Sequence, residues 1–329
     1  MELTKLIARR AVQLVIVLLF VSFFTFLLVR LLPGDPTDII IPFGTEAKKA
    51  QLRADLGLGQ PLYQQYIDYL GNILQGNLGR QYSSGRPVSE LVAQSLPVSI
   101  QLMIYAQLIA LLFALPLGIW AAYRAGSRSD AAINTTGFAL LALPNFVVAL
   151  VLSYFIGARL KWLPTGGYAP GWLDPIFDGT RSTDIGGHFN YMLLPAITLA
   201  LGQIAIYMRL LRSDMIATLK ENFISMARAK GISNLRILWR HALRPSSLTL
   251  LTVVGLNVGA LIGGAIVVEV IFGIPGMGQK ITLAIFSREY IELQGYVLVV
   301  AVLFILVNFF VDFLYTILDP RIRRGRSAT

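Results

Sequence analysis

The sequence predicts an all-α membrane protein with six transmembrane helices and both termini in the cytoplasm. Of its 329 residues, 55% are hydrophobic and only 14% are charged, whereas soluble domains carry about 25% charged residues. Six uncharged runs have about the length that a helix needs to cross the hydrocarbon of a bilayer. Lysines and arginines concentrate in the segments that alternating spans place on one side. These three observations favour lipid as the solvent of this chain.

The six apolar runs define the expected spans. Each must be helical, because lipid offers no hydrogen-bond partner to an unpaired backbone group. Four prolines within or at the start of the runs are expected to kink or to begin helices. No small-residue cleavage signal closes the first run, so we interpret it as a retained helix and not as a signal peptide. The runs are Ala11–Val29, Leu96–Tyr123, Ala131–Ala158, Phe189–Met208, Ser246–Val268 and Leu293–Val311, and the prolines are Pro97, Pro116, Pro144 and Pro195.

The 28 lysines and arginines set the expected orientation. With the N-terminus inside, most of them fall in inside segments, including the loop from Arg209 to Arg244 and the tail from Arg321 to Arg326. Basic residues favour the cytoplasmic side of short loops. This rule explains the formal net charge of +10, and we expect no nucleic-acid partner.

The sequence carries none of the usual patterns of catalysis or metal binding. It has no Cys, which excludes disulfides and thiol-based chemistry. His188 and His241 lie far apart and form no metal-ligand cluster. The stretch around Gly278 is not a phosphate loop, because Gln279 separates that glycine from Lys280. We expect no catalytic residue, no metal site and no cofactor bound by this chain.

Residues 32–95 are expected to form a helical loop outside the membrane, after the first span. Thr45 can cap a helix over Glu46–Leu56. A second helix, Pro61–Leu74, has one apolar face, made of Tyr63, Tyr66, Ile67, Leu70 and Leu74. We interpret these as short helices on the outer mouth, which either cap the bundle or contact the substrate.

Five residues within the spans are candidates for helix packing or pore lining. Gln203 and Asn257 are polar residues in mid-span, where they line a pore or join helices by hydrogen bonds. Gly255, Gly259 and Gly263 form one smooth helix face, which fits a subunit or pore interface and fits packing within this chain equally well.

The segment from Glu269 to Lys280, rich in Gly and Pro, follows the fifth span. Glycine permits the tight backbone of a turn. We interpret the segment as a turn that re-enters the outer mouth, with Glu269, Pro275 and Gly276 as its candidate residues.

The basic loop of residues 213–245 is too polar to span a membrane. Ala227–Lys230 favours a helix that ends at Gly231 in the left-handed conformation. Ser233 or Asn234 can cap a second helix, and Pro245 is expected to restrain a turn into the fifth span. That second helix, Leu235–Leu243, would place Leu235, Leu238, Trp239 and Ala242 on one side. The loop is then either a helix–turn–helix knob with the small residues Ala227, Ala229 and Gly231 at its tip, or an amphipathic segment on the membrane surface.

Two parts of this loop, Ala227–Gly231 and Arg240–Pro245, resemble the coupling (EAA) loop of ABC importer permeases, and more specifically those of the peptide and oligopeptide branch. The resemblance extends over almost the whole chain and is closest to the B-type partner of two permeases. The general motif begins Glu-Ala-Ala, and here Ser225, Met226 and Ala227 take those positions. Other matching stretches are Leu31–Pro36, Leu56–Leu58, Gly76–Gly79, Glu269–Gly273 and Asp319–Arg321.

The resemblance implies a single transmembrane permease domain over residues 1–329, with the type I ABC importer permease fold. It implies a heterodimer with a homologous second permease and a pore that moves di- or oligopeptides into a bacterial or archaeal cell. One or two cytoplasmic ATPase subunits would bind ATP and Mg, and an extracytoplasmic binding protein would deliver peptide. The implied ATPase-coupling residues are Ser225, Met226, Ala227, Arg228, Ala229, Lys230, Gly231, Arg240 and His241.

Two alternatives remain open from the sequence. The same permease branch also serves nickel chelates and glutathione-like solutes. An ATP-independent secondary transporter or channel is the alternative from another class. The six runs, however, contain no Asp, Glu, Lys, Arg or His, the residues that such proteins place within their spans.

Overall fold

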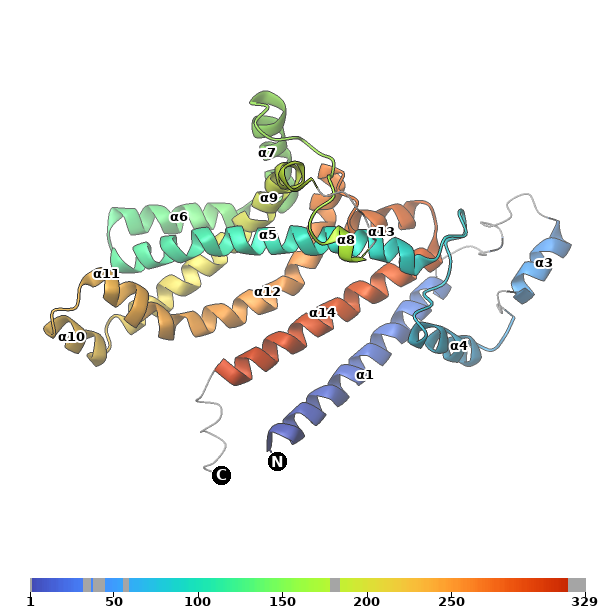
Figure 1. Cartoon of the computed structure of the whole chain (residues 1–329), viewed down its shortest axis with the longest axis horizontal. Helices are drawn as coiled ribbons and strands as arrows, with labels where there is room; N and C mark the ends of the chain where they lie inside the picture. The colour runs from blue at the N-terminus through green and yellow to red at the C-terminus, as the bar shows by residue number, and fades with distance from the viewer. Residues whose placement is uncertain (1, 32–36, 38–44, 56–58, 178–183, 319–329) are drawn as a thin grey trace. The chain divides into compact units, whose positions relative to one another are not determined.

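The computed structural model of the chain describes residues 2–31, 37, 45–55, 59–177 and 184–318 (Figure 1). Their regular structure is helical, apart from one isolated bridge between Arg80 and Pro87. The chain divides into two compact units. The first comprises Met1–Ser99, Trp172–Ser182 and Pro275–Leu306, and the second comprises Ile100–Gly171, Thr183–Ile274 and Val307–Thr329.

The first unit is built around the start of α5 (Val88–Tyr123) and the larger part of α14 (Tyr290–Leu318). Its other helices are α1 (Glu2–Leu31), α3 (Glu46–Asp55), α4 (Leu62–Leu74), α8 (Asp174–Phe177) and α13 (Met277–Phe286). A core cluster of Val88, Leu91, Val92, Met277 and Tyr296 joins α5, α13 and α14. The backbone N–H of Met277 donates to Ser99 Oγ at 2.8 Å, which fixes the start of α13 on α5.

Two buried carboxylates hold the segment that precedes α5. Glu289 accepts hydrogen bonds from the backbone N–H groups of Tyr82 and Ser83 at 2.7 and 2.9 Å. Glu292 accepts one from the Gln81 side chain at 2.7 Å. Three hydrogen bonds therefore attach this loop to the corner between α13 and α14.

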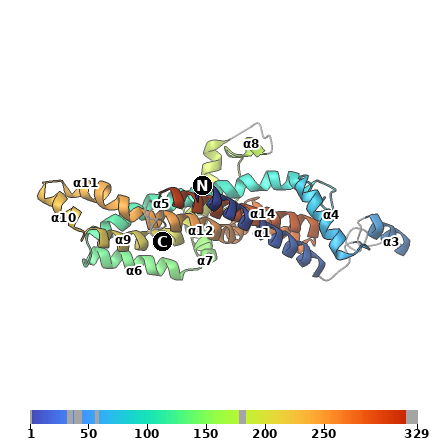
Figure 2. The same ribbon diagram turned by 90° about the horizontal axis from the view of Figure 1, so that it is seen from below.

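The second unit is a helical bundle around α9 (Ile185–Thr218), which packs against α6 (Arg128–Ala142), α7 (Asn145–Leu152) and α12 (Leu243–Phe272). The unit also contains α5 from Ile100 and α14 from Val307. Its remaining elements are η1 (Ser153–Arg159), α10 (Asn222–Ala229), α11 (Asn234–Arg236) and η2 (Ile237–Ala242), of which η1 and η2 are π-helices. The core is formed largely by α9, through Tyr207, Met208, Leu211 and Met215. Figures 1 and 2 both show α10 and α11 together at one end of this unit.

The apolar runs fall on helices, as predicted. Three described helices, Val88–Tyr123, Ile185–Thr218 and Tyr290–Val311, are long and apolar enough to cross a membrane, and up to five spans result if each of two bent pairs counts as one. Helix α1 contributes a shorter apolar stretch, Val12–Leu27. The count of six spans and the location of the termini stay predictions.

The third predicted span, Ala131–Ala158, is divided into two helices. Helix α6 ends at Ala142, and Pro144 begins α7 after a bend of 101°. Proline restrains the residue before it to an extended conformation, and Leu143 has a ψ of 120°. The expectation that Pro144 begins a helix is confirmed, whereas one continuous helix over this run is not found.

The predicted outer loop holds its two expected helices, α3 and α4, with bounds close to those expected. The predicted apolar face of α4 is divided between two environments. Tyr66 and Leu70 are half-buried, whereas Tyr63, Ile67 and Leu74 are exposed.

Candidate functional site

The strongest candidate site is the compact knob formed by residues 222–242 in the second unit. Helix α10 ends where Gly231 takes a φ of +74°, in the left-handed region. The Ile232 N–H donates to Ala227 O and the Gly231 N–H donates to Arg228 O, which is the hydrogen-bond pattern of a Schellman motif. The chain then turns into α11, with Ser233 at its N-cap. The predicted helix–turn–helix shape and the role of Gly231 in ending the first helix are confirmed.

One side of the knob is anchored in the bundle. Ile224, Ala227, Ile237, Leu238 and Ala242 are all less than 9% exposed and belong to the core cluster that α9 dominates. Burying side chains of this size contributes about 1.5–3 kcal/mol for each large one. The knob is therefore packed as part of the bundle.

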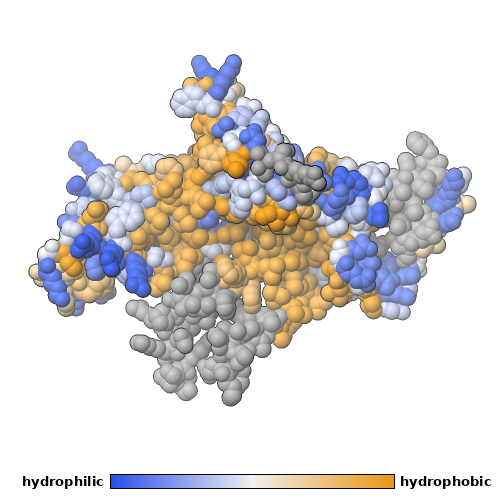
Figure 3. Space-filling model, in the orientation of Figure 1, coloured by the Kyte–Doolittle hydropathy of each residue, from blue (hydrophilic) through white to orange (hydrophobic). Residues whose placement is uncertain are grey.

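The opposite side of the knob presents large apolar side chains to its surroundings. Phe223, Met226, Leu235 and Trp239 are 46–69% exposed. Exposed basic residues lie on the same elements, and Figure 3 shows hydrophilic and hydrophobic side chains intermixed over α10 and α11. The exposed basic residues are Arg228, Lys230, Arg236 and Arg240. An exposed apolar patch with a polar rim is typical of a protein interaction surface.

Two predictions about the surface of the knob were wrong. Ala227 was expected at the tip, but it is 7% exposed and packs into the core. Leu235 and Trp239 were expected to share a face with Leu238, yet they are exposed while Leu238 is buried. The second helix is a π-helix from Ile237 to Ala242, so the spacing of an ordinary α-helix does not predict its faces.

The expected turn at Pro245 is also absent. The π-helix continues directly into α12, and Pro245 lies in the first turn of that helix. Proline has no N–H to donate to the preceding turn. Here the preceding turn is a π-helix, so the hydrogen-bond pattern changes just before Pro245.

Polar contacts close the base of the knob. Thr218 Oγ1, at the end of α9, lies 2.9 Å from Ser246 Oγ, at the start of α12. Ser246 also donates to Ala242 O at 2.9 Å. The two ends of the knob are therefore joined where they meet the bundle.

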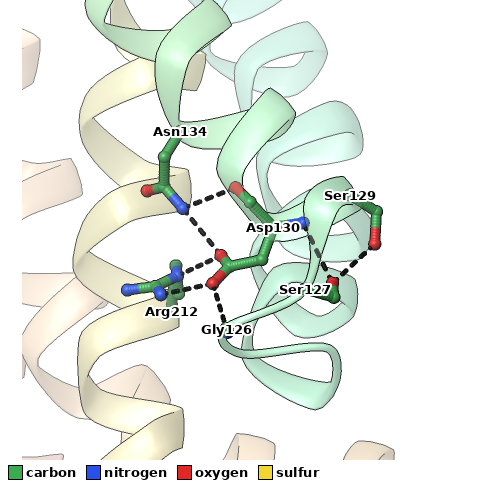
Figure 4. A network of polar contacts seen from close by, with 6 residues as sticks. All are labelled: Gly126, Ser127, Ser129, Asp130, Asn134 and Arg212. Carbon is green, nitrogen blue, oxygen red and sulfur yellow. Dashed lines mark hydrogen bonds and ion pairs between the residues drawn. The ribbon is translucent and has the colours of Figure 1, made fainter.

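A buried ion pair lies close to this base and was not predicted (Figure 4). Arg212 of α9 donates to both carboxylate oxygens of Asp130, at 2.6 and 2.7 Å. Gly126 N–H and Asn134 Nδ2 also donate to that carboxylate, at 2.9 and 2.7 Å. Ser127 caps α6 by accepting from the Asp130 N–H. Asp130 and Arg212 are 82 positions apart, and their pairing has no local sequence signal.

The mid-span polar residues Gln203 and Asn257 both lie in the second unit. Gln203 is 9% exposed, and its Oε1 has no hydrogen-bond partner among the described residues. Asn257 is half-buried. Tyr207, one turn after Gln203, donates to Gln107 Oε1 at 3.2 Å. Sequence reasoning missed Gln107 and Tyr207, although both are polar residues within predicted spans. Whether these residues line a pore stays a prediction.

The glycine face of α12 has two environments. A Cβ at Gly255 would overlap the side chain of Val311 in α14, whereas Gly263 has nothing within 4 Å of that position. Gly255 therefore serves packing within this chain. At Gly263 the face is open, so an interface there stays a prediction, as it does for Gly259.

The candidate residues of the outer mouth lie at the end of α12 and the start of α13. Gly273 has a φ of +61° and the Ile274 N–H donates to Glu269 O, so the predicted turn is confirmed. Gly276 is the N-cap residue of α13. Glu269 is 0% exposed, so its side chain is not part of an open surface. Roles for Glu269, Pro275 and Gly276 at a mouth stay predictions.

The described residues contain no group of three or more His, Asp or Glu side chains that could hold a metal ion. Asp184 caps α9, and its carboxylate accepts a hydrogen bond from the Gly187 N–H. Together, the long apolar helices and the knob define the class of this protein: a helical integral membrane protein with a candidate protein-docking surface at one end of its second unit.

Comparison with known proteins gives the family. The description "Binding-protein-dependent transport system inner membrane component" matches residues 114–324, and the N-terminal component of the same system matches residues 3–103. The chain belongs to this family of transport-system membrane components.

Curated relatives match over nearly their full length. The di/tripeptide transport system permease protein DppB of Pseudomonas aeruginosa is 38% identical, over 97% of this chain and 99% of that protein. The oligopeptide transport system permease protein AppB of Bacillus subtilis is 36% identical, over 96% and 98%. A probable peptide ABC transporter permease of Sinorhizobium fredii, y4tP, is 34% identical, over 96% and 98%.

Among solved structures, an inward-facing MetNI methionine ABC transporter matches with a TM-score of 0.56 at 11% identity, over 70% of this chain and 96% of that chain. This likeness shows that the two chains share a fold.

Proposed function

We propose that this chain is a pore-forming subunit of an ATP-driven importer that carries di- or oligopeptides into the cell, and that the knob docks on a cytoplasmic ATPase subunit. The observation that carries the docking proposal is the division of the knob into a buried anchor and an exposed apolar patch. The names of the relatives, which are peptide, di/tripeptide and oligopeptide permeases, support the substrate class.

The composition of the patch suits a protein partner. Aromatic and methionine side chains are enriched at the centres of interfaces, and a polar rim surrounds them. Trp239 and Met226 supply such a centre, with 47% and 59% of their surfaces exposed. The basic rim, including Arg228 and Arg240, favours an acidic surface on the ATPase.

The anchor explains how movement of the partner would reach the bundle. Because Ile224 and Ala242 are fully buried in the α9 core cluster, displacing the knob requires the ends of α9 and α12 to move with it. Packed helices have discrete arrangements rather than continuous ones. In this proposal Gly231 forms the turn between the two helices of the knob. Ala227 holds the knob in the bundle by packing and does not contact the ATPase.

The remaining parts of the transporter follow from this proposal. A homologous second permease would complete the pore, and one or two ATPase subunits would bind ATP and Mg. An extracytoplasmic binding protein would deliver the peptide. The chain would be a multi-pass protein of a bacterial or archaeal cell membrane and would carry out no covalent chemistry.

Docking can be tested by co-purification. Trp239→Ala should reduce ATPase recovered with the permease, because it removes a large exposed aromatic from the centre of the patch. Trp162→Ala is the matched control, since Trp162 is also exposed, at 73%, but lies outside the knob. Equal ATPase recovery with both variants, and with Leu235→Glu, would overturn docking through this patch.

The substrate proposal needs a separate test. Uptake of labelled dipeptides and oligopeptides by the reconstituted complex should require ATP. Uptake of a nickel chelate or glutathione but not of peptides would reject the substrate class and leave the docking result unaffected. Uptake by this chain without ATPase subunits would instead support a secondary transporter or channel.

A further inference from the structure

Helix α4 lies against the apolar part of α1, and both belong to the first unit. The Tyr66 hydroxyl donates to Leu19 O at 3.2 Å and lies 2.9 Å from Ser22 Oγ. The ring of Tyr66 packs edge-on against Phe23, with centroids 5.3 Å apart. Phe26 is 4% exposed and lies against Tyr66 and Tyr69.

The contacts of Tyr66 set the depth of α4 along α1. Leu19 is ten residues before Val29, where the apolar run ends, which is about 15 Å along a helix that rises 1.5 Å per residue. The hydrocarbon of a bilayer is about 30 Å thick. The ring of Tyr66 lies against Phe23 and Phe26, six and three residues before Val29, which is about 9 and 5 Å along the helix. If α1 spans the membrane along its apolar run, α4 therefore lies near the end of that run, and only the Tyr66 hydroxyl reaches deeper, to Leu19.

The surface of α4 is amphipathic at this depth. Tyr63, Ile67 and Leu74 are 69%, 62% and 87% exposed, and their spacing of four and seven residues places them on one side of the helix. The exposed polar residues Gln64, Asp68 and Asn72 follow a separate side of the helix at intervals of four. Large exposed apolar faces mark contact with a partner or a membrane.

The exposed apolar side of α4 continues the apolar surface of α1. Phe23, which touches Tyr66, is itself 46% exposed, and Phe20 and Phe24 on the same helix are 65% and 51% exposed. In a membrane-spanning helix such side chains contact lipid. Continuity with this surface indicates lipid as the occupant of the α4 face.

We propose that α4 is embedded in the membrane as an amphipathic helix, in the leaflet opposite the basic N-terminal end of α1. Tyr63, Ile67 and Leu74 contact acyl chains, and Gln64, Asp68 and Asn72 face headgroups or water, as in helices that lie in the membrane interface. The Tyr66 hydroxyl satisfies its hydrogen bond on the backbone of α1, which removes the cost of placing it in an apolar environment.

The absence of Cys from the chain allows a direct test, because a single introduced Cys carries a single label. Ile67→Cys and Leu74→Cys place a fluorophore on the apolar side, and Asp68→Cys and Gln64→Cys are matched controls one or a few residues away. Phe20→Cys on α1 reports the signal of a lipid-facing site. All positions are exposed, so a label should not disturb packing, and uptake by each labelled complex checks this.

The measurement is quenching in the whole transporter complex reconstituted in lipid nanodiscs. We expect brominated acyl chains to quench the labels at 67 and 74 several-fold more than those at 64 and 68, with iodide in solution giving the reverse order. Strong iodide quenching at 67 and 74 would place this face in water and overturn the proposal. Protection from both quenchers at these positions would show that another protein subunit covers the face, and would overturn it equally.

Discussion

Arg212 and Asp130 form a two-fold hydrogen-bonded ion pair between α9 and the first turn of α6, with N–O distances of 2.6 and 2.7 Å. The Asp130 side chain is 6% exposed and that of Arg212 is 26% exposed. The pair lies six residues before Thr218, where α9 meets the base of the knob. It thereby fixes the beginning of α6 to α9, the helix that leads into the knob.

Removing one partner of this pair should destabilise the protein strongly. Arg212→Ala removes the cation from a carboxylate that keeps its hydrogen bonds from Gly126 and Asn134, which costs at most about 3–5 kcal/mol, and thermal unfolding in detergent measures the loss. The control is Arg86→Ala, because the Arg86–Glu90 pair is 43% and 53% exposed and such pairs contribute at most about 1 kcal/mol. The double variant Asp130→Asn with Arg212→Gln should recover part of the stability, and equal losses for Arg212→Ala and Arg86→Ala would contradict this account.

Gly231→Ala should destabilise the turn of the knob by about 1 kcal/mol, because a side chain is strained at positive φ. Nothing lies within 4 Å of the added Cβ, so the cost is conformational and not steric. The measurements are thermal unfolding and ATPase co-purification. Gly71→Ala in α4, which also has open space but no positive φ, should be neutral or slightly stabilising, and a similar loss at both positions would count against the left-handed turn.

The glycine face of α12 should respond differently at its two ends. Gly255→Ala should cost about 1–3 kcal/mol, because its Cβ would overlap Val311 and overpacking forces neighbours to shift. Gly263→Ala has open space and should leave the stability of the isolated chain unchanged. Thermal unfolding of both variants measures these effects. Adding Val311→Ala to Gly255→Ala should restore stability, and failure to do so would argue against the contact between residues 255 and 311.

The two sides of the knob should separate stability from docking. Ile224→Ala should cost about 2–4 kcal/mol, since Ile224 is 0% exposed in the core cluster and its removal leaves a cavity. Leu235→Ala, at 69% exposure, should change stability by less than about 0.5 kcal/mol while lowering ATPase recovery. Unfolding curves and co-purification of the same two variants distinguish the roles, and a large stability loss with Leu235→Ala would show that its side chain is part of the core.

Features that depend on length, composition and local backbone chemistry could be predicted from the sequence. The apolar runs are helices, Pro144 begins one of them, and Gly231 ends the first helix of the knob in the left-handed conformation. These outcomes depend on a residue and its close neighbours along the chain, because proline restricts its own backbone and glycine permits a positive φ. The motif matches also indicated the family.

Tertiary structure decided which side of each element is covered. Ala227 is buried, and Trp239 is exposed although Leu238 beside it is buried, because the α9 core and the π-helix, rather than the spacing of an α-helix, set the faces of the knob. Tyr66 and Ile67 are adjacent, yet only the first is held by α1. The Asp130–Arg212 pair joins residues 82 positions apart. Apolar faces of membrane helices look alike in sequence, since lipid and protein neighbours accept the same side chains, so only the packed bundle distinguishes them.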